Sequence, residues 1–345
     1  MAKRRLNRRQ AWRIQKIQDE RIARAERKAA LPEPPETGAD LGPEQRGLII
    51  AHYGTQVEVE ALEGPHRGQT WRAHLRANLD PLVAGDRVAW RAGAASGVIV
   101  ARLPRRSELL RPDPAGALRP VAANIDYIIV VLAPEPQPHA LMLDRYLVAA
   151  QSQDIEAIIL LNKCDLLDCN HRPAIDRLLE PYAGIGYRVL QASTHSGAGI
   201  DDLRRLLADH TSVFTGQSGV GKSSLINALL PAANARTGQL STATGKGRHT
   251  TTTAQLFHFP DGGDLIDAPG IRDFGLIHLD PDAIARGFPE FRPFLGHCKF
   301  RDCRHQDEPA CALLAAVASG AISERRLHSY RFLVASLADA RGAGH

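Results

Sequence analysis

Hydrophobic positions alternate with polar ones along residues 47–118, in short runs that turn residues separate. Five runs show this pattern: GLIIAHYG, TQVEVEAL, QTWRAHL, GDRVAW and GVIVARL. A period of two places the apolar side chains on one face of a strand. Five short strands at this spacing predict a small closed β-barrel, and we favour an OB-type barrel. A different five-stranded barrel, or one that serves only as a packing module, is the alternative.

Beyond Pro120 the pattern changes to nearly continuous apolar runs that alternate with helix-like stretches. NIDYIIVVLAP and IEAIILLNK are typical of buried strands, LDRYLVAAQSQ and IDDLRRLLADH of helices, and GYRVLQAS and TSVFTG add further strand-like runs. This order predicts βαβ units and a parallel sheet over residues 119–280. ALLAAVASGAIS and RRLHSYRFLVASLADA then predict a small helical domain over 281–345. The fold class that we expect is a multidomain chain.

Charge is concentrated at the N-terminus. Residues 1–30 hold 11 Lys and Arg against 3 Asp and Glu, whereas the rest of the chain is slightly acidic. We interpret residues 1–46 as a basic arm followed by a Pro-rich linker, with polyanion contact as the function of the arm. A charge run that only aids solubility is the alternative. No apolar run is long enough to span a membrane and no signal peptide is recognisable, so we expect no membrane contact and a cytoplasmic protein.

One glycine-rich segment carries a nucleotide-binding signature, G-x-x-x-x-G-K-[ST], between the strand-like SVFT and the helix-like SLINALL. Such a loop turns its backbone N–H groups toward phosphate oxygens, its lysine reaches the β- and γ-phosphates, and its serine hydroxyl ligates Mg²⁺. The predicted phosphate-binding residues are Gly216, Gln217, Ser218, Gly219, Val220, Gly221, Lys222, Ser223 and Ser224.

Two later segments complete a predicted triphosphate site. Asp267 and Gly270 form a D-x-x-G motif at the end of an apolar run, 45 positions after Lys222. The aspartate suits a contact to Mg²⁺, and the Gly270 N–H suits the γ-phosphate. Between the motifs lies GKGRHTTTTAQL, a loop in which we select Thr251 from the threonines 250–253 as an Mg²⁺ ligand that is engaged when the triphosphate is bound.

An N-K-x-D motif precedes the phosphate loop instead of following it. Asn162, Lys163 and Asp165 come directly after the apolar run IEAIIL, at the expected carboxyl end of a parallel strand, where nucleotides bind in open α/β sheets. The Asp165 carboxylate can accept hydrogen bonds from guanine N1–H and N2–H₂, a pair of donors that adenine lacks. Ala192 and Ser193 are the expected second loop beside the base. The predicted ligands are therefore GTP and GDP, with Mg²⁺ bound alongside GTP.

The residue after D-x-x-G bears on hydrolysis. Ras-like enzymes orient the attacking water with a glutamine there, and this chain has Ile271. An aliphatic side chain cannot hydrogen-bond water, so we expect slow unassisted hydrolysis. His249 is the nearest polar substitute and is our candidate catalytic residue, acting once a partner orders its loop. A surface or RNA contact is its alternative role.

Four metal-ligand residues follow in the pattern C-x4-C-x-H-x5-C: Cys298, Cys303, His305 and Cys311. Three thiolates and an imidazole make a closed tetrahedral set for one structural Zn²⁺, with no position left for a catalytic water. Unliganded cysteines that group by chance are the alternative. Cys164 and Cys169 flank the N-K-x-D motif, and we assign them no function.

These motifs, in this order, resemble the RsgA (YjeQ/YloQ) family of circularly permuted GTPases over about residues 47–330. The resemblance implies an N-terminal OB barrel over 47–118, a permuted P-loop GTPase domain over 119–280 and a C-terminal zinc-binding domain over 281–345. It also implies that the N-K-x-D motif recognises guanine, that the cysteines and histidine bind zinc, and that the protein binds the small (30S) ribosomal subunit with its rRNA late in maturation. The subunit would stimulate slow GTP hydrolysis. We expect a monomer.

Two other functions compete with this interpretation. A nucleotide-gated RNA-binding scaffold would use the same residues while hydrolysis is incidental. An ATP-driven RNA remodeller would require tolerance of adenine, and the sequence shows no helicase-like second lobe. The three differ in whether turnover is required and in which base is accepted.

Overall fold

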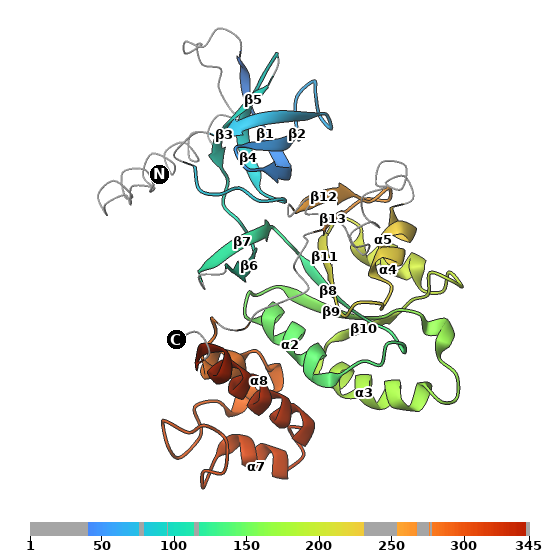
Figure 1. Cartoon of the computed structure of the whole chain (residues 1–345), viewed down its shortest axis with the longest axis vertical. Coiled ribbons are helices and arrows are strands. Elements are labelled where there is room, and N and C mark those ends of the chain that lie inside the picture. Colours follow the sequence, from blue (N-terminus) through green and yellow to red (C-terminus); the bar gives the residue numbers. More distant parts are fainter. Residues whose placement is uncertain are drawn as a thin grey trace.

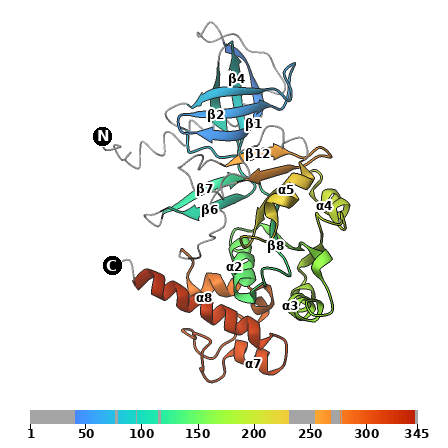
Figure 2. The ribbon, with the colours of Figure 1, turned by 45° about the vertical axis from the view of Figure 1, so that its right-hand side comes forward.

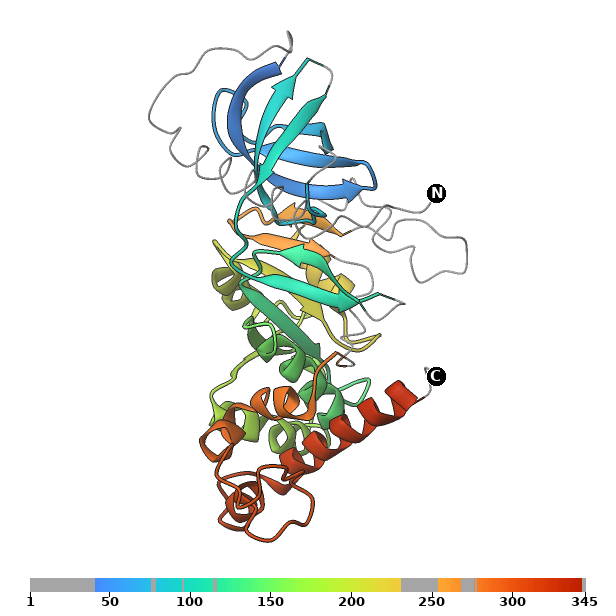
Figure 3. The same ribbon diagram turned by 90° about the vertical axis from the view of Figure 1, so that its left-hand side faces the viewer.

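The computed structural model arranges the chain as three parts stacked along its long axis (Figure 1). It describes residues 41–75, 79–94, 96–113, 117–230, 254–267, 276 and 278–342, with side chains through Leu337. A β-barrel lies at one end, an α/β unit in the middle and a group of helices at the other end (Figures 2 and 3). Residues 1–40, which contain the predicted basic arm and most of the predicted linker, lie outside the described residues.

The N-terminal barrel is built from the five alternating runs. Its strands are β1 (Leu41–Tyr53), β2 (Gln56–Ala61), β3 (Thr70–Leu75), β4 (Arg87–Gly93) and β5 (Gly97–Arg102). β1 pairs with both β2 and β4, and β3 pairs with β5 in parallel, so the order β1-β2-β3-β5-β4 closes on itself. Val57, Val59 and Trp90 are fully buried inside, as alternation requires. The predicted five-stranded OB-type barrel is confirmed.

The middle unit is a mostly parallel sheet in the order β10-β9-β8-β11-β13-β12. Its strands are β8 (Tyr127–Leu132), β9 (Glu156–Leu161), β10 (Arg188–Gln191), β11 (Thr211–Thr215), β12 (Gln255–His258) and β13 (Asp264–Asp267). Only β12 in this set is antiparallel to its neighbour β13. Because β8 lies between β9 and β11, the segments that follow these three strands emerge at one edge of the sheet.

Helices cover both faces of this sheet because its central strands are apolar on both sides. Ile128, Val130 and Leu132 of β8 belong to a buried cluster with α2 (Ala140–Gln151) and α3 (Arg172–Ile185). The alternate residues Ile129 and Val131 belong to a second cluster with α4 (Ile200–Leu207) and α5 (Lys222–Leu229). The continuous apolar run of β8 is therefore what a two-sided core requires.

The observed strands extend beyond the predicted ones in three places. β1 begins at Leu41, within the segment expected to be a linker, because Leu41 and Glu44 pair with β4. Pro43 lies at the register shift between these two pairs, where its lack of an N–H group interrupts no regular ladder hydrogen bond. β6 (Glu108–Pro112) and β7 (Leu118–Ala123) form a separate hairpin after the barrel. β12 takes up Gln255, which the sequence placed in a loop, and pairs with β1 as well as β13.

The C-terminal part packs on the α2 side of the sheet. It contains α6 (Pro281–Arg286), the 3₁₀ segment η5 (Pro289–Phe294), the short α7 (Ala312–Ala318) and the long α8 (Glu324–Gly342). Phe288 and Phe291 stack on each other in its interior, and Tyr330 meets both rings edge-on. These helices share the α2 and α3 core, so the part is not an isolated module. Among the described helices, none combines the length and the hydropathy that crossing a membrane requires.

Candidate functional site

The phosphate loop connects β11 to α5, and two of its glycines are required by close approaches. Gly216 has a φ of 134°, and a Cβ there would lie 2.2 Å from the carbonyl oxygen of Val131. Gly221 has a φ of 92°, and a Cβ there would lie 2.3 Å from the Nδ2 atom of Asn162. Residues that carry a Cβ atom rarely adopt such φ values, and these short distances leave no room for a Cβ. The loop is thus pressed against β8 on one side and the N-K-x-D motif on the other.

The Lys222 side chain lies across the phosphate loop. Its Nζ atom donates to the carbonyl oxygens of Gly216 and Gln217 at 2.7 and 2.6 Å. Lys222 is also the first residue of α5, which starts at the end of the loop. The ammonium group therefore lies beside the backbone N–H groups at a helix N-terminus, a combination that attracts phosphate.

Asn162 joins the N-K-x-D motif to the phosphate loop. This side chain is buried, and its Nδ2 donates to the carbonyl oxygen of Val220 at 2.8 Å, across 58 positions of sequence. Lys163 adopts the left-handed conformation with a φ of 57°, and its Nζ donates to the carbonyl oxygen of Glu135 at 2.8 Å. The two motifs that the sequence separates therefore form one continuous surface. The role of Glu135 carries no sequence signal because it is played by a backbone carbonyl.

Asp165 is held by the loop after β10. The Ser193 hydroxyl donates to Asp165 Oδ1 at 2.5 Å, and the same oxygen of Ser193 accepts the N–H groups of His195 and Ser196 at 3.1 Å. The Ser193 hydrogen bond lowers the pKa of the Asp165 carboxyl below its usual range. Asp165 is thus an exposed, ionised acceptor three residues after Asn162. Its partner Ser193 belongs to the loop that the sequence predicted beside the base.

Asp267 lies on the strand next to the one that leads into the phosphate loop. It is the last residue of β13, whose neighbour β11 leads into the phosphate loop, and it lies opposite Gln255 in β12. His249, Thr251 and Gly270 lie outside the described residues.

The four predicted metal ligands come together at the C-terminal end of the molecule. The ligand atoms of Cys298, Cys303, His305 and Cys311 all lie within 4.8 Å of one another, so the cluster could hold a metal ion. His305 Nδ1 is 3.6, 3.5 and 3.3 Å from the sulfur atoms of Cys298, Cys303 and Cys311. His305 has a φ of 58°, and Arg331 of α8 donates to its carbonyl oxygen at 2.9 Å.

The spacing of this cluster fits a tetrahedral zinc ion. Zinc–sulfur bonds of about 2.3 Å and zinc–nitrogen bonds of about 2.0 Å give tetrahedral edges of about 3.8 Å between sulfurs and about 3.5 Å between sulfur and nitrogen. The observed separations are 3.9 Å between Cys298 and Cys311 and 3.3–3.6 Å to nitrogen. All five cysteines are free thiols. A single divalent cation at the centre therefore satisfies all four donors.

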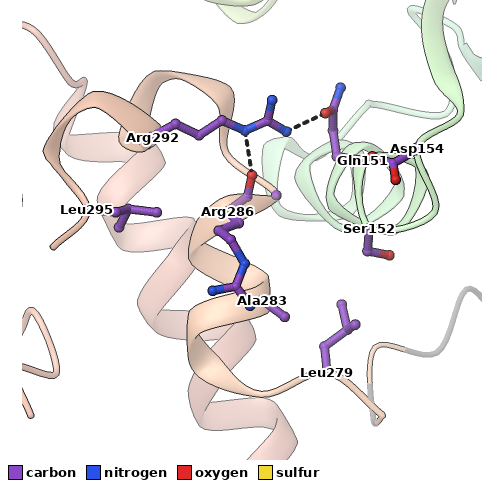
Figure 4. Close-up of a pocket in the computed structure, with 9 residues that line it drawn as sticks. Gln151, Ser152, Asp154, Leu279, Ala283, Arg286, Arg292 and Leu295 are labelled. Carbon is purple, nitrogen blue, oxygen red and sulfur yellow. Dashed lines mark hydrogen bonds between the residues drawn. The ribbon is translucent and has the colours of Figure 1, made fainter.

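A cavity of about 540 Å³ lies elsewhere, between the end of α2 and the segment from Leu279 to Leu295. Figure 4 shows Arg292 at its wall, where Nη2 donates to Gln151 Oε1 at 2.7 Å and Nε donates to the carbonyl oxygen of Arg286 at 2.9 Å. None of the predicted nucleotide or metal residues lines it. The cavity marks the junction of the middle and C-terminal parts.

The guanine-type N-K-x-D motif precedes the phosphate loop in this chain, and the two are in contact beside a parallel sheet. This order of motifs defines a circularly permuted P-loop GTPase. The family model described as RsgA GTPase matches residues 102–277. The chain belongs to the RsgA GTPase family, and it is a GTP hydrolase.

Relatives and solved structures agree along nearly the whole chain. The small ribosomal subunit biogenesis GTPase RsgA of Pseudomonas aeruginosa (strain LESB58) is 58% identical over 338 residues, which cover 98% of both chains. The crystal structure of YjeQ from Thermotoga maritima has a TM-score of 0.71 and 32% identity, covering 86% of this chain and 99% of that one. YloQ, a circularly permuted GTPase, has a TM-score of 0.69 and 28% identity, covering 88% and 99%.

Proposed function

We propose that GTP binds with its base at Asn162, Lys163 and Asp165 and its phosphates on residues 216–224. The hydrogen bond from Asn162 to the Val220 carbonyl carries this proposal, because it makes the two motifs one site. Asp165, ionised and fixed by Ser193, would accept the guanine N1–H and N2–H₂ donors. Lys222, which lies across the loop, would exchange its carbonyl contacts for the β- and γ-phosphates.

The same proposal assigns the magnesium and hydrolysis residues. Ser223 would ligate Mg²⁺ and Asp267 would contact it at the end of β13, while Thr251 and Gly270 would respond to the γ-phosphate. Because Ile271 follows D-x-x-G, intrinsic hydrolysis would be slow. We propose that His249 orients the attacking water when a partner orders its loop.

The partner that we propose is the small ribosomal subunit with its rRNA, late in its maturation. The relatives that match 98% of the chain are named for biogenesis of that subunit. The basic segment 1–30 and the OB-type barrel suit a polyanion of this kind. The subunit would stimulate GTP turnover, and the protein would act as a cytoplasmic monomer.

We also propose that Cys298, Cys303, His305 and Cys311 hold one structural Zn²⁺. The tetrahedral spacing of the cluster and its three sulfur donors support zinc over the hard cations, which prefer oxygen. Because all four positions are filled by protein, zinc would stabilise the fold and take no part in hydrolysis.

The proposed function is tested by GTP turnover of the full chain with and without purified small subunits. We expect stimulation by small subunits, and none by large subunits at matched concentration. The Lys222→Ala variant should lose turnover by about 10²–10³-fold, the range found when one donor to developing negative charge is removed. Equal turnover with and without small subunits would contradict the proposal. If the Lys222→Ala chain still cycles on and off its partner normally in cells, the scaffold alternative is correct.

Base selectivity gives a second test. Replacing Asp165 by asparagine exchanges one acceptor oxygen for a donor, so the carboxamide would clash with guanine N2–H₂ and suit the 2-oxo group of xanthine. We expect Asp165→Asn to prefer xanthine over guanine nucleotides in a competition binding assay. Asp168→Asn, whose carboxylate instead bonds to His171 three residues later, is the matched control and should keep guanine selectivity. Unchanged selectivity in Asp165→Asn would remove this residue from base recognition.

A further inference from the structure

The barrel and the GTPase sheet are joined at the strand pair that flanks the nucleotide site. β12 pairs with β1 of the barrel through Gln255 and Ala51, and with β13 through Gln255 and Asp267. Ala51, Gln255 and Asp267 therefore form one row across three strands. Figure 1 shows β12 and β13 between the barrel and the rest of the sheet. A shift of the barrel relative to the sheet would displace this row.

Apolar contacts continue across the same junction. Leu48 and Ile50 of β1 share a buried cluster with Leu256 of β12 and Ile266 of β13. Gly85 of the barrel is also close, because a Cβ there would lie 2.9 Å from the Cδ1 atom of Ile266. These contacts join the barrel to the start of β12, and His258 lies at the other end of the strand.

His258 bridges two carboxylates that belong to different parts of the molecule. Its Nε2 is 2.6 Å from Glu60 Oε2, in β2 of the barrel, and its Nδ1 is 2.6 Å from Asp264 Oδ1, in β13. The hydrogen bonds to Asp264 and Glu60 raise the pKa of His258 to about 10, so the ring is a cation at neutral pH and both nitrogens donate. We call these three residues the barrel clamp.

We propose that His258 is a positioning residue that couples the barrel to the strands leading into the nucleotide site. The Glu60 side chain is 14% exposed and that of His258 is 47% exposed, so the carboxylate is the better shielded partner of this contact. β12 directly follows the segment that carries His249 and Thr251, and β13 ends at Asp267. A ligand on the barrel and a nucleotide on the phosphate loop would then bias the same two strands, which is the requirement for coupling between sites.

The alternative role for His258 is local. His258 and Asp264 face each other in the β12–β13 ladder, so their contact alone would brace that hairpin without involving the barrel. The two roles differ at Glu60. A barrel clamp needs Glu60 and a hairpin brace does not, so Glu60→Gln is the variant that discriminates between them.

The first experiment measures amide hydrogen exchange of β1 and β2 in the full chain, with GDP and with a non-hydrolysable GTP analogue. Under the clamp proposal exchange in the barrel depends on the nucleotide, and both His258→Gln and Glu60→Gln reduce that dependence. His258→Arg, which keeps a cation with several donors, should restore it. Arg188→Gln removes an exposed pair with Glu156 at the far edge of the sheet and serves as the control. Barrel exchange that ignores the nucleotide in the unmodified chain would overturn the proposal, as would full dependence in Glu60→Gln.

The second experiment measures GTP turnover with and without small subunits, and it rests on the proposed function. We expect His258→Gln and Glu60→Gln to lose about fivefold or more of the stimulation, the lower range of coupling between sites, while intrinsic turnover stays within about twofold. The double variant should lose no more than either single one. If the unmodified chain is not stimulated, the proposed function fails and the exchange experiment still decides the clamp. Full stimulation of Glu60→Gln overturns the clamp alone.

Discussion

Replacing Cys311 by serine is expected to unfold the segment around the metal cluster and to lower the free energy of unfolding by about 5 kcal/mol or more. A structural zinc ion contributes on the order of 10 kcal/mol to folding, and loss of one thiolate removes much of that. The segment from Cys298 to Ala318 contains only the seven-residue α7 as regular structure, so little besides the proposed metal would hold it. The melting temperature by calorimetry and the zinc content by mass spectrometry measure the effect.

Cys169→Ser is the matched control for this prediction, because Cys169 is an exposed thiol outside the cluster. It should change neither zinc content nor stability. A Cys311→Ser chain with an unchanged melting temperature, or purified protein with no zinc and full stability, would contradict a structural metal.

The four-residue metal cluster also predicts how zinc affinity depends on pH. Burial raises the pKa of the Cys303 thiol to about 12 when no cation is present, so metal binding must displace protons from the cluster. The metal-free state then binds more protons than the metal-bound state. Zinc affinity should therefore fall as the pH is lowered, and a chelator should remove zinc faster at pH 6 than at pH 8.

Local patterns predicted where the candidate nucleotide and metal residues lie in the fold, because such groups are recognised by residue type and spacing. The C-x4-C-x-H-x5-C spacing led to four ligand atoms within 4.8 Å of one another. The N-K-x-D motif lay after a buried strand, as the run IEAIIL predicts, and Asn162 reached the phosphate loop. Alternation with a period of two likewise predicted the barrel strands, since one face of each had to be buried.

Long-range pairing was not predictable in the same way. Gln255 was assigned to a loop because its neighbours are threonines, yet strands on both sides supply hydrogen-bond partners that override this local preference. The link between Glu60 and His258 spans 198 positions and involves two ordinary polar residues with no motif. The burial of Arg326 was not predictable either, because a charged residue in a helix-like run is expected at the surface, whereas the structure buries this side chain almost completely.

Replacing Arg326 by methionine is expected to lower the free energy of unfolding by about 3–5 kcal/mol, the cost of removing one partner from a buried ion pair. Arg326 of α8 pairs with Asp144 of α2 and, at 2.6 Å, with Glu290 of η5. Burial alone would lower the pKa of Arg326, but the charges of Asp144 and Glu290 raise it, so the group stays charged. Without the arginine, the fully buried Asp144 would keep a single hydrogen bond among the described residues, the one from the Tyr182 hydroxyl.

This cluster is the joint between the GTPase unit and the C-terminal helices, since its members come from α2, α3, η5 and α8. The Arg326 guanidinium also stacks on Phe288, with 4.4 Å between the charge centre and the ring. Loss of the joint should expose α8 to hydrogen exchange while the phosphate loop, which lies on the other face of the sheet with α5, keeps its affinity for GTP.

Arg325→Met is the matched control, because Arg325 is the adjacent arginine on α8. Arg326 pairs with both carboxylates, whereas Arg325 donates to the carbonyl oxygen of Leu178 at 3.1 Å and lies over the Tyr182 ring at 5.3 Å. Its loss should cost only about 1 kcal/mol. Replacing Asp144 by leucine and Glu290 by methionine together with Arg326→Met removes all three charges, and should recover much of the lost stability because no buried charge is left unpaired. Equal denaturation midpoints for Arg325→Met and Arg326→Met would show that the cluster does not hold the two parts together.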